Sequence, residues 1–400
     1  MLIVQKYGGT SVGTLERIRA VADRVIETKT SGNDLVVVVS AMSGETNKLI
    51  EYAEFFSKTP SQAEMDILLS AGERVTSALL AIALNELGYP SVAMSGRQAG
   101  IITDSFHTKA RIDHIDTTFM RKALDESKIV VVAGFQGITS EGRITTLGRG
   151  GSDLSAVAIA GALEADLCEI FTDVDGVYTT DPRIEPKAKK LDKISYDEML
   201  ELASLGAKVL QNRSVELAKK LNVNLITRNS FNKNEGTLIT KEENIMEQAV
   251  VSGIALDKNQ ARITLRGVVD KPGIAASIFK KLADNNINVD MIIQNVGVDG
   301  TTNLGFTVPQ NELEFAKKIM EELQSSEKLE YDNDIVKVSI VGVGMKSHSG
   351  VAALAFNALA NDNINIEMIS TSEIKISMII KAKYGELAVR TLHKAYKLDR

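Results

Sequence analysis

The stretch "IVQKYGGTSVG" (3–13) decides the fold class of this chain. Its first residues give the pattern of a short strand, Gly8 and Gly9 break that pattern, and a helical pattern begins near Leu15. A strand, a glycine turn and a helix N-terminus form an anion site, because free backbone N–H groups and the helix dipole face the turn. A Walker A loop is excluded, since its lysine follows the glycines and Lys6 precedes them. From these residues alone, a phosphate loop and a tight turn with an unrelated lysine both stay open.

The same alternation of strand and helix patterns continues to about residue 240. The strand candidates are 2–7, 35–40, 91–95, 129–135, 167–172 and 223–227. The helix candidates are 14–29, 61–87, 117–126, 152–163, 195–203 and 211–221. This alternation predicts an α/β fold with a mostly parallel sheet between helices. Ligands of such sheets bind beyond the carboxyl ends of the strands, where four polar loops with glycine are expected: "GGTSVG", "SAMSGETNK", "GRGGSD" and "TDVDGVYTTDPR".

An internal repeat appears after residue 245. The segment "KPGIAASIFKKLADNNINVDMI" (271–292) matches "HSGVAALAFNALANDNINIEMI" (348–369), with Gly273 and Gly350 among the pairs that stand 77 residues apart. Each copy reads as a strand, a glycine turn, a helix and a strand that begins at "NINV" or "NINI". The repeat predicts two βαββαβ modules of about 70 residues each. Beside a domain with catalytic-looking loops, two such modules suggest a built-in sensor.

The composition is that of an ordinary soluble protein of two or three domains. The chain has 400 residues, 24% of them charged, and a net charge of −6 with both signs interspersed. This charge does not favour nucleic acid or a membrane surface as a partner, and the longest apolar runs have the length of strands. One cysteine, Cys168, and the lack of a signal-peptide pattern predict a cytoplasmic location. With four histidines and one cysteine, a zinc site is not expected.

The loop "TLGRGGSD" (146–153) places Arg149 directly before two glycines. Glycines let the backbone approach a ligand closely, and a guanidinium binds a carboxylate or a phosphate through two parallel hydrogen bonds. Ser152 and Asp153 follow at a helix start, where such residues are also common as simple caps. The loop therefore indicates an anionic ligand chiefly through its arginine.

Two further stretches carry polar groups with more than one reading. "FTDVDGVYTTDPR" (171–183) lacks the later spacing and final glutamate of an EF-hand, so a nucleotide loop and a solvated turn both stay open. In "SAGERVTSALLAIAL" (70–84), Glu73 lies near the start of an apolar-faced helix. It either complements the helix dipole or recognises the ammonium group of a substrate.

Together these stretches resemble the aspartokinases, within the amino-acid kinase superfamily. The resemblance covers nearly the whole chain: "KYGGTSVG", "SAMSGETN", "SAGER", "TDSFHTKARI", "GRGGSD", "FTDVDGVYTTDPR" and "GAKVLQNRSVELAKK" follow in the family's order. The repeats look like the tandem ACT domains of the lysine-regulated, monofunctional enzymes. Phe106 stands where the family more often has a small polar residue, and no role is assigned to it.

The resemblance implies three structural parts. An amino-acid-kinase domain, with a mostly parallel sheet sandwiched by helices, would cover residues 1–245. A first ACT module would cover 262–330, and a second would combine the strand 249–256 with residues 336–400. The first repeat is then inserted in the second.

The resemblance also implies the reaction. The γ-phosphoryl group of MgATP would pass to the side-chain carboxylate of L-aspartate, giving 4-phospho-L-aspartate, the first step towards lysine, threonine and methionine. A carboxylate is already a nucleophile at neutral pH, so catalysis should come from positioning and charge stabilisation. Lys6 would act on the transferring phosphoryl group, Gly8 and Gly9 would support it through their N–H groups, and Asp153 would orient Lys6.

The remaining site residues carry over position by position. Arg149 would clamp a carboxylate of aspartate and Glu73 would hold its α-ammonium group. The rest of the aspartate pocket would be Ser40, Thr46, Gly150, Gly151 and Ser152. The ATP site would comprise Lys6, Tyr7, Gly8, Gly9, Thr172, Asp173, Tyr178, Asp181, Arg183 and Lys208. Magnesium is implied with ATP, and no protein ligand is assigned to it.

In the C-terminal half, the resemblance implies sites for feedback amino acids, lysine or threonine or both. The matching residues are Asp270, Gly273, Ile274 and Gln294 in the first copy and Asn363, Asn365 and Ile366 in the second. Turn capping explains Asp270 and the asparagines equally well. A homodimer or homotetramer through the ACT modules is expected. Met246 is either a linker methionine or the internal start of a shorter regulatory subunit.

Three readings of the function follow. The first is an aspartate kinase inhibited by lysine or by lysine with threonine. The second is a relative with another acceptor, such as glutamate or a nucleoside monophosphate, and "SAGER" and "GRGGSD" beside ACT repeats speak against it. The third is a catalytically silent amino-acid sensor, which would have no need of Lys6, Glu73, Arg149 and Asp153 together.

Overall fold

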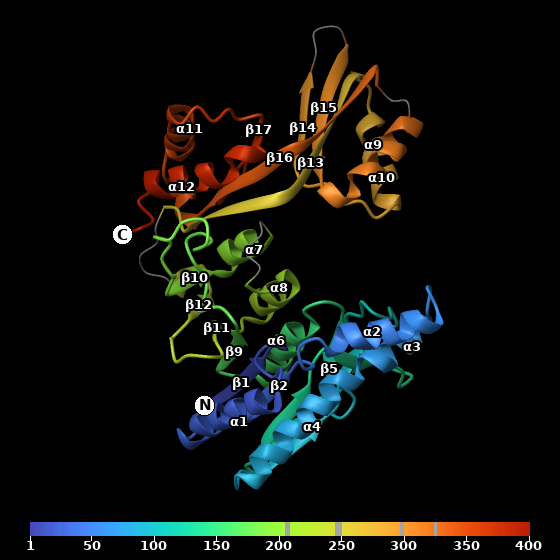
Figure 1. Cartoon of the computed structure of the whole chain (residues 1–400), viewed down its shortest axis with the longest axis vertical. Helices are drawn as coiled ribbons and strands as arrows, with labels where there is room; N and C mark the ends of the chain where they lie inside the picture. The colour runs from blue at the N-terminus through green and yellow to red at the C-terminus, as the bar shows by residue number, and fades with distance from the viewer. Residues whose placement is uncertain (205–208, 245–249, 297–299, 324–325) are drawn as a thin grey trace. The chain divides into compact units, whose positions relative to one another are not determined.

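The computed structural model divides the chain into two compact units, which are described separately. Unit 1 comprises Met1–Val177, Lys190–Ser204 and Lys208–Glu247, and unit 2 comprises Tyr178–Lys189, Leu205–Ala207 and Gln248–Arg400. The structure describes residues 1–204, 209–244, 250–296, 300–323 and 326–400. Two predicted positions, Lys208 and Met246, lie outside the described residues. Figure 1 shows the elements of each unit.

Unit 1 is built on a mostly parallel eight-stranded sheet, as the sequence predicts. Its strands run in the order β10-β12-β11-β9-β1-β2-β6-β3. Their bounds are β1 Leu2–Tyr7, β2 Asp34–Val39, β3 Ser91–Met94, β6 Ile129–Ala133, β9 Leu167–Thr172, β10 Lys193–Ser195, β11 Leu225–Asn229 and β12 Thr237–Thr240. β1 lies between β2 and β9 and is parallel to both. β12 runs antiparallel to its neighbour β11, and β10 is parallel to β12, so these two strands at one edge of the sheet run opposite to the others.

Successive side chains of β1 point to opposite faces of this sheet, and helices cover both faces. Ile3 and Tyr7 join one core with residues of α1 (Leu15–Thr30) and α4 (Ala71–Glu86). Lys6 points to the other side, towards α6 (Gly151–Leu163). The remaining helices of the unit are α2 Glu45–Phe56, α3 Gln62–Leu69, α5 Thr118–Asp125, α7 Tyr196–Ser204 and α8 Asn212–Leu221. Cys168 is buried in β9, and burial raises the pKa of its thiol, which agrees with a packing role.

Several features of unit 1 differ from the sequence-based expectation, and α2, β10 and β12 were not among the predicted elements. The stretch 61–87 is divided at Ser70 into two helices, α3 and α4, although Ser70 itself keeps right-handed helical backbone angles. Its carbonyl also accepts a hydrogen bond from Gln136 Nε2 at 2.9 Å. A separate sheet in the order β5-β4-β7-β8 was not predicted. Its strands, β4 Ile101–Thr103, β5 Ile112–Ile115, β7 Gln136–Ile138 and β8 Ile144–Thr146, are too short to show a periodic pattern.

The segment 62–86, which holds α3 and α4, is long and apolar enough to cross a membrane by length and composition. Half of its most apolar window is buried inside the protein, as in a core helix. The segment also carries the buried carboxylates Asp66 and Glu73. These features indicate a helix pair packed in a protein core.

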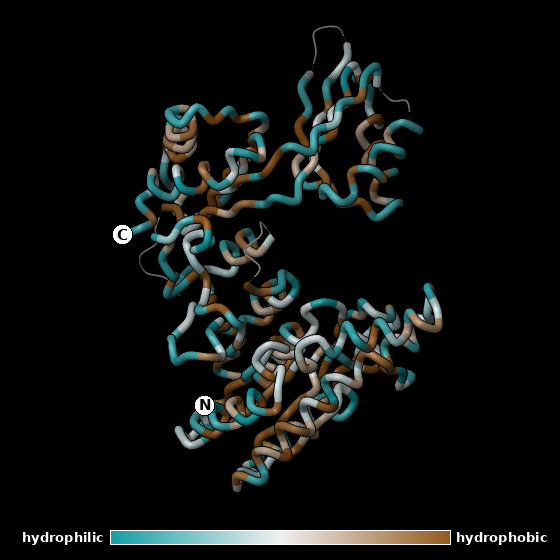
Figure 2. Tube along the Cα trace, viewed as in Figure 1, coloured by the Kyte–Doolittle hydropathy of each residue, from teal (hydrophilic) through white to brown (hydrophobic). Residues whose placement is uncertain are grey.

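Unit 2 holds the repeat, and its two modules share one sheet in the order β14-β15-β13-β16-β18-β17. The strands are β13 Gly253–Val269, β14 Ile292–Val296, β15 Thr301–Val308, β16 Lys328–Val341, β17 Met368–Thr371 and β18 Lys375–Lys381. The helices are α9 Ile274–Asp284, α10 Leu313–Leu323, α11 Val351–Asn361 and α12 Gly385–Ala395. The long strands β13 and β16 pair antiparallel through both modules. Figure 2 shows hydrophobic residues along the strands of the sheet, where the helices pack.

The prediction that a strand begins at "NINV" and "NINI" is wrong. β14 and β17 begin several residues later, at Ile292 and Met368. Asn286 and Asn363 adopt left-handed backbone angles, with φ of 57° and 55°, and so end the helical turns before them.

The two modules meet through side chains that correspond in the repeat. Met291 and Met368 lie in one small buried cluster with Ile335 and Ile379. Beside it, Arg262 of the first module forms an ion pair with Glu367 of the second, at 2.8 Å. Asp290, the repeat equivalent of Glu367, forms an ion pair with Lys337. The contact between the modules is therefore reciprocal.

Helix α4 allows a test of the core of unit 1. Leu80 is fully buried in that core, whereas Ile82 on the same helix is 64% exposed. We expect L80A to lower the free energy of unfolding by about 2–5 kcal/mol, because it leaves a cavity. The matched variant I82A should change it by no more than about 0.5 kcal/mol. Urea unfolding would measure both, and equal losses would contradict this packing.

Candidate active site

A buried ion pair lies at the carboxyl end of β1. Lys6 Nζ is 2.6 Å from Asp153 Oδ1, and the two side chains are only 10% and 14% exposed. Lys6 comes from β1, and Asp153 comes from the first turn of α6. The pair therefore joins the first glycine loop to "GRGGSD", two of the loops that the sequence singled out.

Glycines allow these loops to approach each other. A Cβ on Gly134, just after β6, would lie 2.9 Å from Val38 Cγ1 and 3.0 Å from Ser152 Cβ, so a side chain there would push α6 away. Gly150 caps α6 with a φ of 74°, which favours glycine. A Cβ on Gly9 would lie 3.1 Å from Ala41 O. The Gly8 N–H donates to Phe171 O at 3.3 Å, so this N–H is already engaged.

Glu73 is buried in the first turn of α4, beside the loop after β2. Its Oε1 accepts a hydrogen bond from Ala41 N at 3.1 Å, and its Oε2 is buried without a hydrogen-bond partner in the described part of the chain. Burial raises the pKa of the Glu73 carboxyl to about 7, and the bond from Ala41 offsets this only in part. The free oxygen suits a ligand that donates hydrogen bonds or carries positive charge.

Arg149 has the opposite character, because its backbone is held while its side chain is free. The carbonyl of Arg149 accepts a hydrogen bond from Gln211 Nε2 at 2.7 Å, and the side chain is exposed. Among the described residues, no acid or carbonyl pairs with its guanidinium. Arg149 is thus available for an anionic ligand.

The other residues predicted for the aspartate pocket flank this region. Ser40 follows β2, and its N–H donates to Tyr7 O at 3.1 Å. Thr46 lies in the first turn of α2, and both side chains are half-buried. Gly151 and Ser152 are buried at the start of α6.

The residues predicted for ATP divide between the two units. Thr172 ends β9 in unit 1 and Asp173 follows it, where the Asp173 carbonyl accepts a hydrogen bond from Asn229 Nδ2 at 3.3 Å. Tyr178, Asp181 and Arg183 lie in the segment that clusters with unit 2. There Arg183 forms an ion pair with Asp181 at 2.7 Å. Tyr7 is buried and stacks on Phe171, with 4.6 Å between the ring centroids, so its side chain is part of the core.

The residues predicted for an effector in the first module come together. Asp270, Gly273, Ile274 and Gln294 all line one pocket of about 310 Å³ in unit 2. Asn363, Asn365 and Ile366 do not line it and lie in the turn between α11 and β17. The structure thus brings together the first predicted set but not the second.

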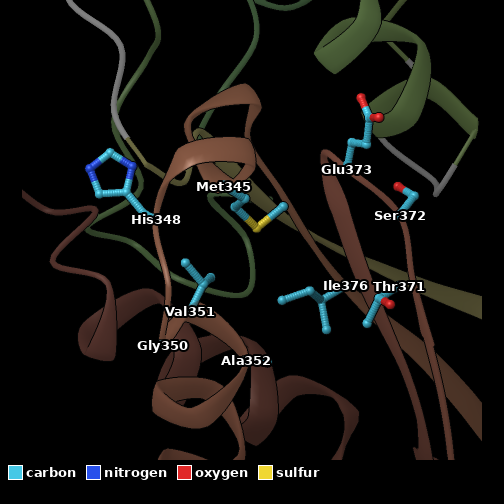
Figure 3. Close-up of a pocket in the computed structure, with 9 residues that line it drawn as sticks. All are labelled: Met345, His348, Gly350, Val351, Ala352, Thr371, Ser372, Glu373 and Ile376. Carbon is cyan, nitrogen blue, oxygen red and sulfur yellow. The ribbon is translucent and has the colours of Figure 1, made fainter.

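A second pocket, of about 510 Å³, lies at the equivalent place in the second module. Gly350, Val351 and Thr371 line it, and they stand 77 residues after Gly273, Ile274 and Gln294. Figure 3 shows Thr371, Ser372 and Glu373 on one side of this pocket and Met345, His348 and Val351 on the other. These residues are not among the predicted effector contacts, although the constant offset of the repeat relates them to the first set.

The comparisons with known proteins agree with both units. The model of the amino acid kinase family matches residues 1–229, and a model of the ACT domain matches 263–323 and 338–396. An aspartokinase of Helicobacter pylori is 62% identical over the full length of both chains. An aspartokinase of Pseudomonas aeruginosa is 56% identical over all of this chain and 98% of its own.

Solved structures give the same result. The crystal structure of E. coli aspartokinase III with aspartate and ADP superposes with a TM-score of 0.80 at 26% identity, covering 99% of each chain. The same enzyme with lysine and aspartate gives a TM-score of 0.79.

The chain belongs to the amino acid kinase family, a class of phosphotransferases, and carries two ACT domains. Within that family it belongs to the aspartokinases, so it is an enzyme.

A kinase needs a divalent metal ion with its nucleotide. Among the residues that the structure describes, no group of three or more His, Cys, Asp or Glu side chains could hold a metal. Asp153, a carboxylate at the start of α6, is already paired with Lys6. The described residues therefore assign no protein ligand to such an ion.

The burial of Glu73 predicts a pH effect on stability. Its pKa of about 7 in the folded protein exceeds the ordinary value of 4.5, so the folded state holds this proton more tightly than the unfolded state. Stability should therefore fall as pH rises from about 4.5 to about 7. The quantity to compare is the free energy of unfolding of E73Q minus that of the unmodified protein. This difference should be about 3 kcal/mol larger at pH 8 than at pH 4.5.

Urea unfolding at both pH values measures this difference. E86Q is the matched control, because Glu86 ends the same helix and is exposed. If the difference in free energy of unfolding between E73Q and the unmodified protein is the same at both pH values, burial does not raise the pKa of Glu73.

Proposed function

We propose that the enzyme transfers the γ-phosphoryl group of MgATP to the side-chain carboxylate of L-aspartate, giving 4-phospho-L-aspartate. The observation that carries this proposal is the buried Lys6–Asp153 ion pair beside the first glycine loop. It places a positive charge at the carboxyl end of the central strand, where a nucleotide's phosphates would lie. The aspartokinase relatives support the choice of acceptor.

The chemistry needs no strong base, because the acceptor carboxylate is already ionised at neutral pH. Lys6 stabilises negative charge on the phosphoryl group during transfer. Asp153 holds the Lys6 ammonium in place, so little reorganisation is needed at the moment of reaction. When bound, Mg²⁺ neutralises charge on the nucleotide's phosphates.

The aspartate pocket would use two groups of opposite charge. Arg149 offers an exposed guanidinium to a carboxylate of the substrate, and Glu73 offers its free buried oxygen to the α-ammonium group. An amino acid zwitterion presents these two charges together. Gly150, Gly151, Ser152, Ser40 and Thr46 would complete the pocket.

The nucleotide site is proposed from the resemblance of its motifs and from the ADP in the E. coli relative. Gly8, Gly9, Thr172, Asp173, Tyr178, Asp181, Arg183 and Lys208 would contact ATP. With the N–H of Gly8 engaged by Phe171, Gly9 is the better backbone donor to a phosphate.

The ACT modules would bind feedback amino acids. The pocket of Asp270, Gly273, Ile274 and Gln294 supports this role, as does the lysine in the E. coli relative. The turn of Asn363, Asn365 and Ile366 would meet an effector across an interface between two copies of the chain. The same proposal includes the place of the reaction as the first step towards lysine, threonine and methionine, a cytoplasmic location and a dimer or tetramer. It also includes the domain bounds, which are 1–245 for the kinase domain, 262–330 for the first ACT module, and 249–256 with 336–400 for the second.

Substitution of Lys6 tests the chemistry. With MgATP and aspartate, the unmodified protein should form an acyl phosphate that hydroxylamine traps as aspartyl hydroxamate. K6M should lower kcat at least about 100-fold, because the charge that stabilises the transferring group is lost. K29M is the matched control, since Lys29 also pairs with an aspartate, Asp34, but at the amino end of β2. No hydroxamate from the unmodified protein would promote the silent-sensor reading.

Substitution of Asp270 tests the effector pocket. D270A should raise the lysine or threonine concentration for half-inhibition about tenfold or more, because a carboxylate that faces the effector's ammonium is lost. Activity without effector should be unchanged. D284A controls for the loss of a surface charge, since Asp284 is exposed at the end of α9. Equal inhibition of D270A and D284A would argue against this pocket.

A further inference from the structure

Asp66 of α3 is a fully buried carboxylate away from the proposed contacts with substrate. It accepts hydrogen bonds from His107 Nδ1 at 2.6 Å, from Thr108 N at 3.0 Å and from Thr146 Oγ1 at 2.5 Å. One carboxylate thus ties α3 to the loop at 107–108 and to the last residue of β8. Because a buried charge is costly without partners, it constrains all three segments.

Arg213 of α8 holds the next residues from another side. Its Nη1 donates to Leu147 O at 2.8 Å and its Nη2 donates to Ala110 O at 3.1 Å. Ala110 N in turn donates to Thr146 O at 2.9 Å. A planar guanidinium can bridge two carbonyls in this way, whereas a lysine ammonium presents a single charged centre.

Gln211, the N-cap residue of α8, contacts the same loop next to Arg149. Its Nε2 donates to the carbonyl of Arg149, and a Cβ on Gly150 would lie 2.9 Å from its side chain. The segment 146–150 is therefore held by Asp66 of α3, Arg213 of α8 and the N-cap residue Gln211, while the guanidinium of Arg149 stays exposed. A backbone that is already fixed lowers the cost of ordering this loop when a ligand binds.

We propose that Asp66, Gln211 and Arg213 form a clamp that positions Arg149 for the substrate carboxylate. This rests on the role of Arg149 in the proposed function. The three are positioning residues, since they act through the Thr146 hydroxyl and the carbonyls of Leu147 and Arg149 and are not proposed to contact substrate. Misplacement of a binding group by about 1 Å costs up to a hundredfold in activity, so the clamp should determine how well aspartate binds.

The expected signature is selective for aspartate. R213K and R213Q should raise the KM for aspartate about tenfold or more and leave the KM for ATP within about twofold. D66N and Q211A should act in the same direction. R121Q is the matched control, because Arg121 also donates to a backbone carbonyl, Leu163 O, at the end of α6 opposite to Arg149. A uniform loss of activity and of thermal stability, with both KM values unchanged, would overturn the clamp.

A double-mutant cycle distinguishes this inference from the proposed function. If the clamp acts through Arg149, R213Q should raise the KM for aspartate in the unmodified protein but change it less than twofold in R149Q. Multiplicative effects of the two substitutions would overturn the clamp while leaving the role of Arg149 intact. An unchanged KM in R149Q itself would instead overturn the role of Arg149. Should R213Q fail to fold, Q211A in the same cycle gives the same decision.

Discussion

The buried ion pair between Lys6 and Asp153 is the interaction on which the rest of the active site depends. A lysine withdrawn from water is costly unless an opposite charge meets it, so α6 has to begin beside the end of β1. That requirement explains the glycines around it. Gly134 leaves room for Ser152, and Gly150 takes the left-handed conformation that turns the chain into α6. The glycine-rich loops are therefore the geometric condition for placing one positive charge.

The proposed aspartate pocket differs from the Lys6–Asp153 pair, because its two proposed binding groups are available to a ligand. Among the described residues Glu73 has no partner for one buried oxygen, and Arg149 keeps an exposed guanidinium. The unpaired buried oxygen is a cost in the free protein that the ammonium group of a zwitterionic ligand would relieve. The surrounding structure supplies the rigidity: Ala41 fixes Glu73, and the clamp fixes the backbone at Arg149.

The sequence predicted the parts of the fold whose patterns are long or repeated. The central strands were correct because continuous apolar runs, such as 129–133 of β6, have few alternative structures. The division of 61–87 at Ser70 was not predicted, since Ser70 keeps right-handed helical backbone angles and the local pattern marks no break there. Lys6 and Asp153 could be paired from motifs alone, whereas Asp66 and Arg213 could not, because their partners are mostly backbone groups of distant segments. The second effector-like pocket was within reach through the 77-residue offset.

The shared strands of unit 2 have a consequence for how such proteins change over evolutionary time. β13 and β16 each run through both modules, so the two modules share these strands and neither has a separate sheet. A recombination event within either strand would leave two half-sheets with open edges, and these are prone to aggregate. We therefore expect the two modules to be gained or lost together as one unit. Divergence of one sensor from the other has to proceed by substitution around the pockets, with the common strands preserved.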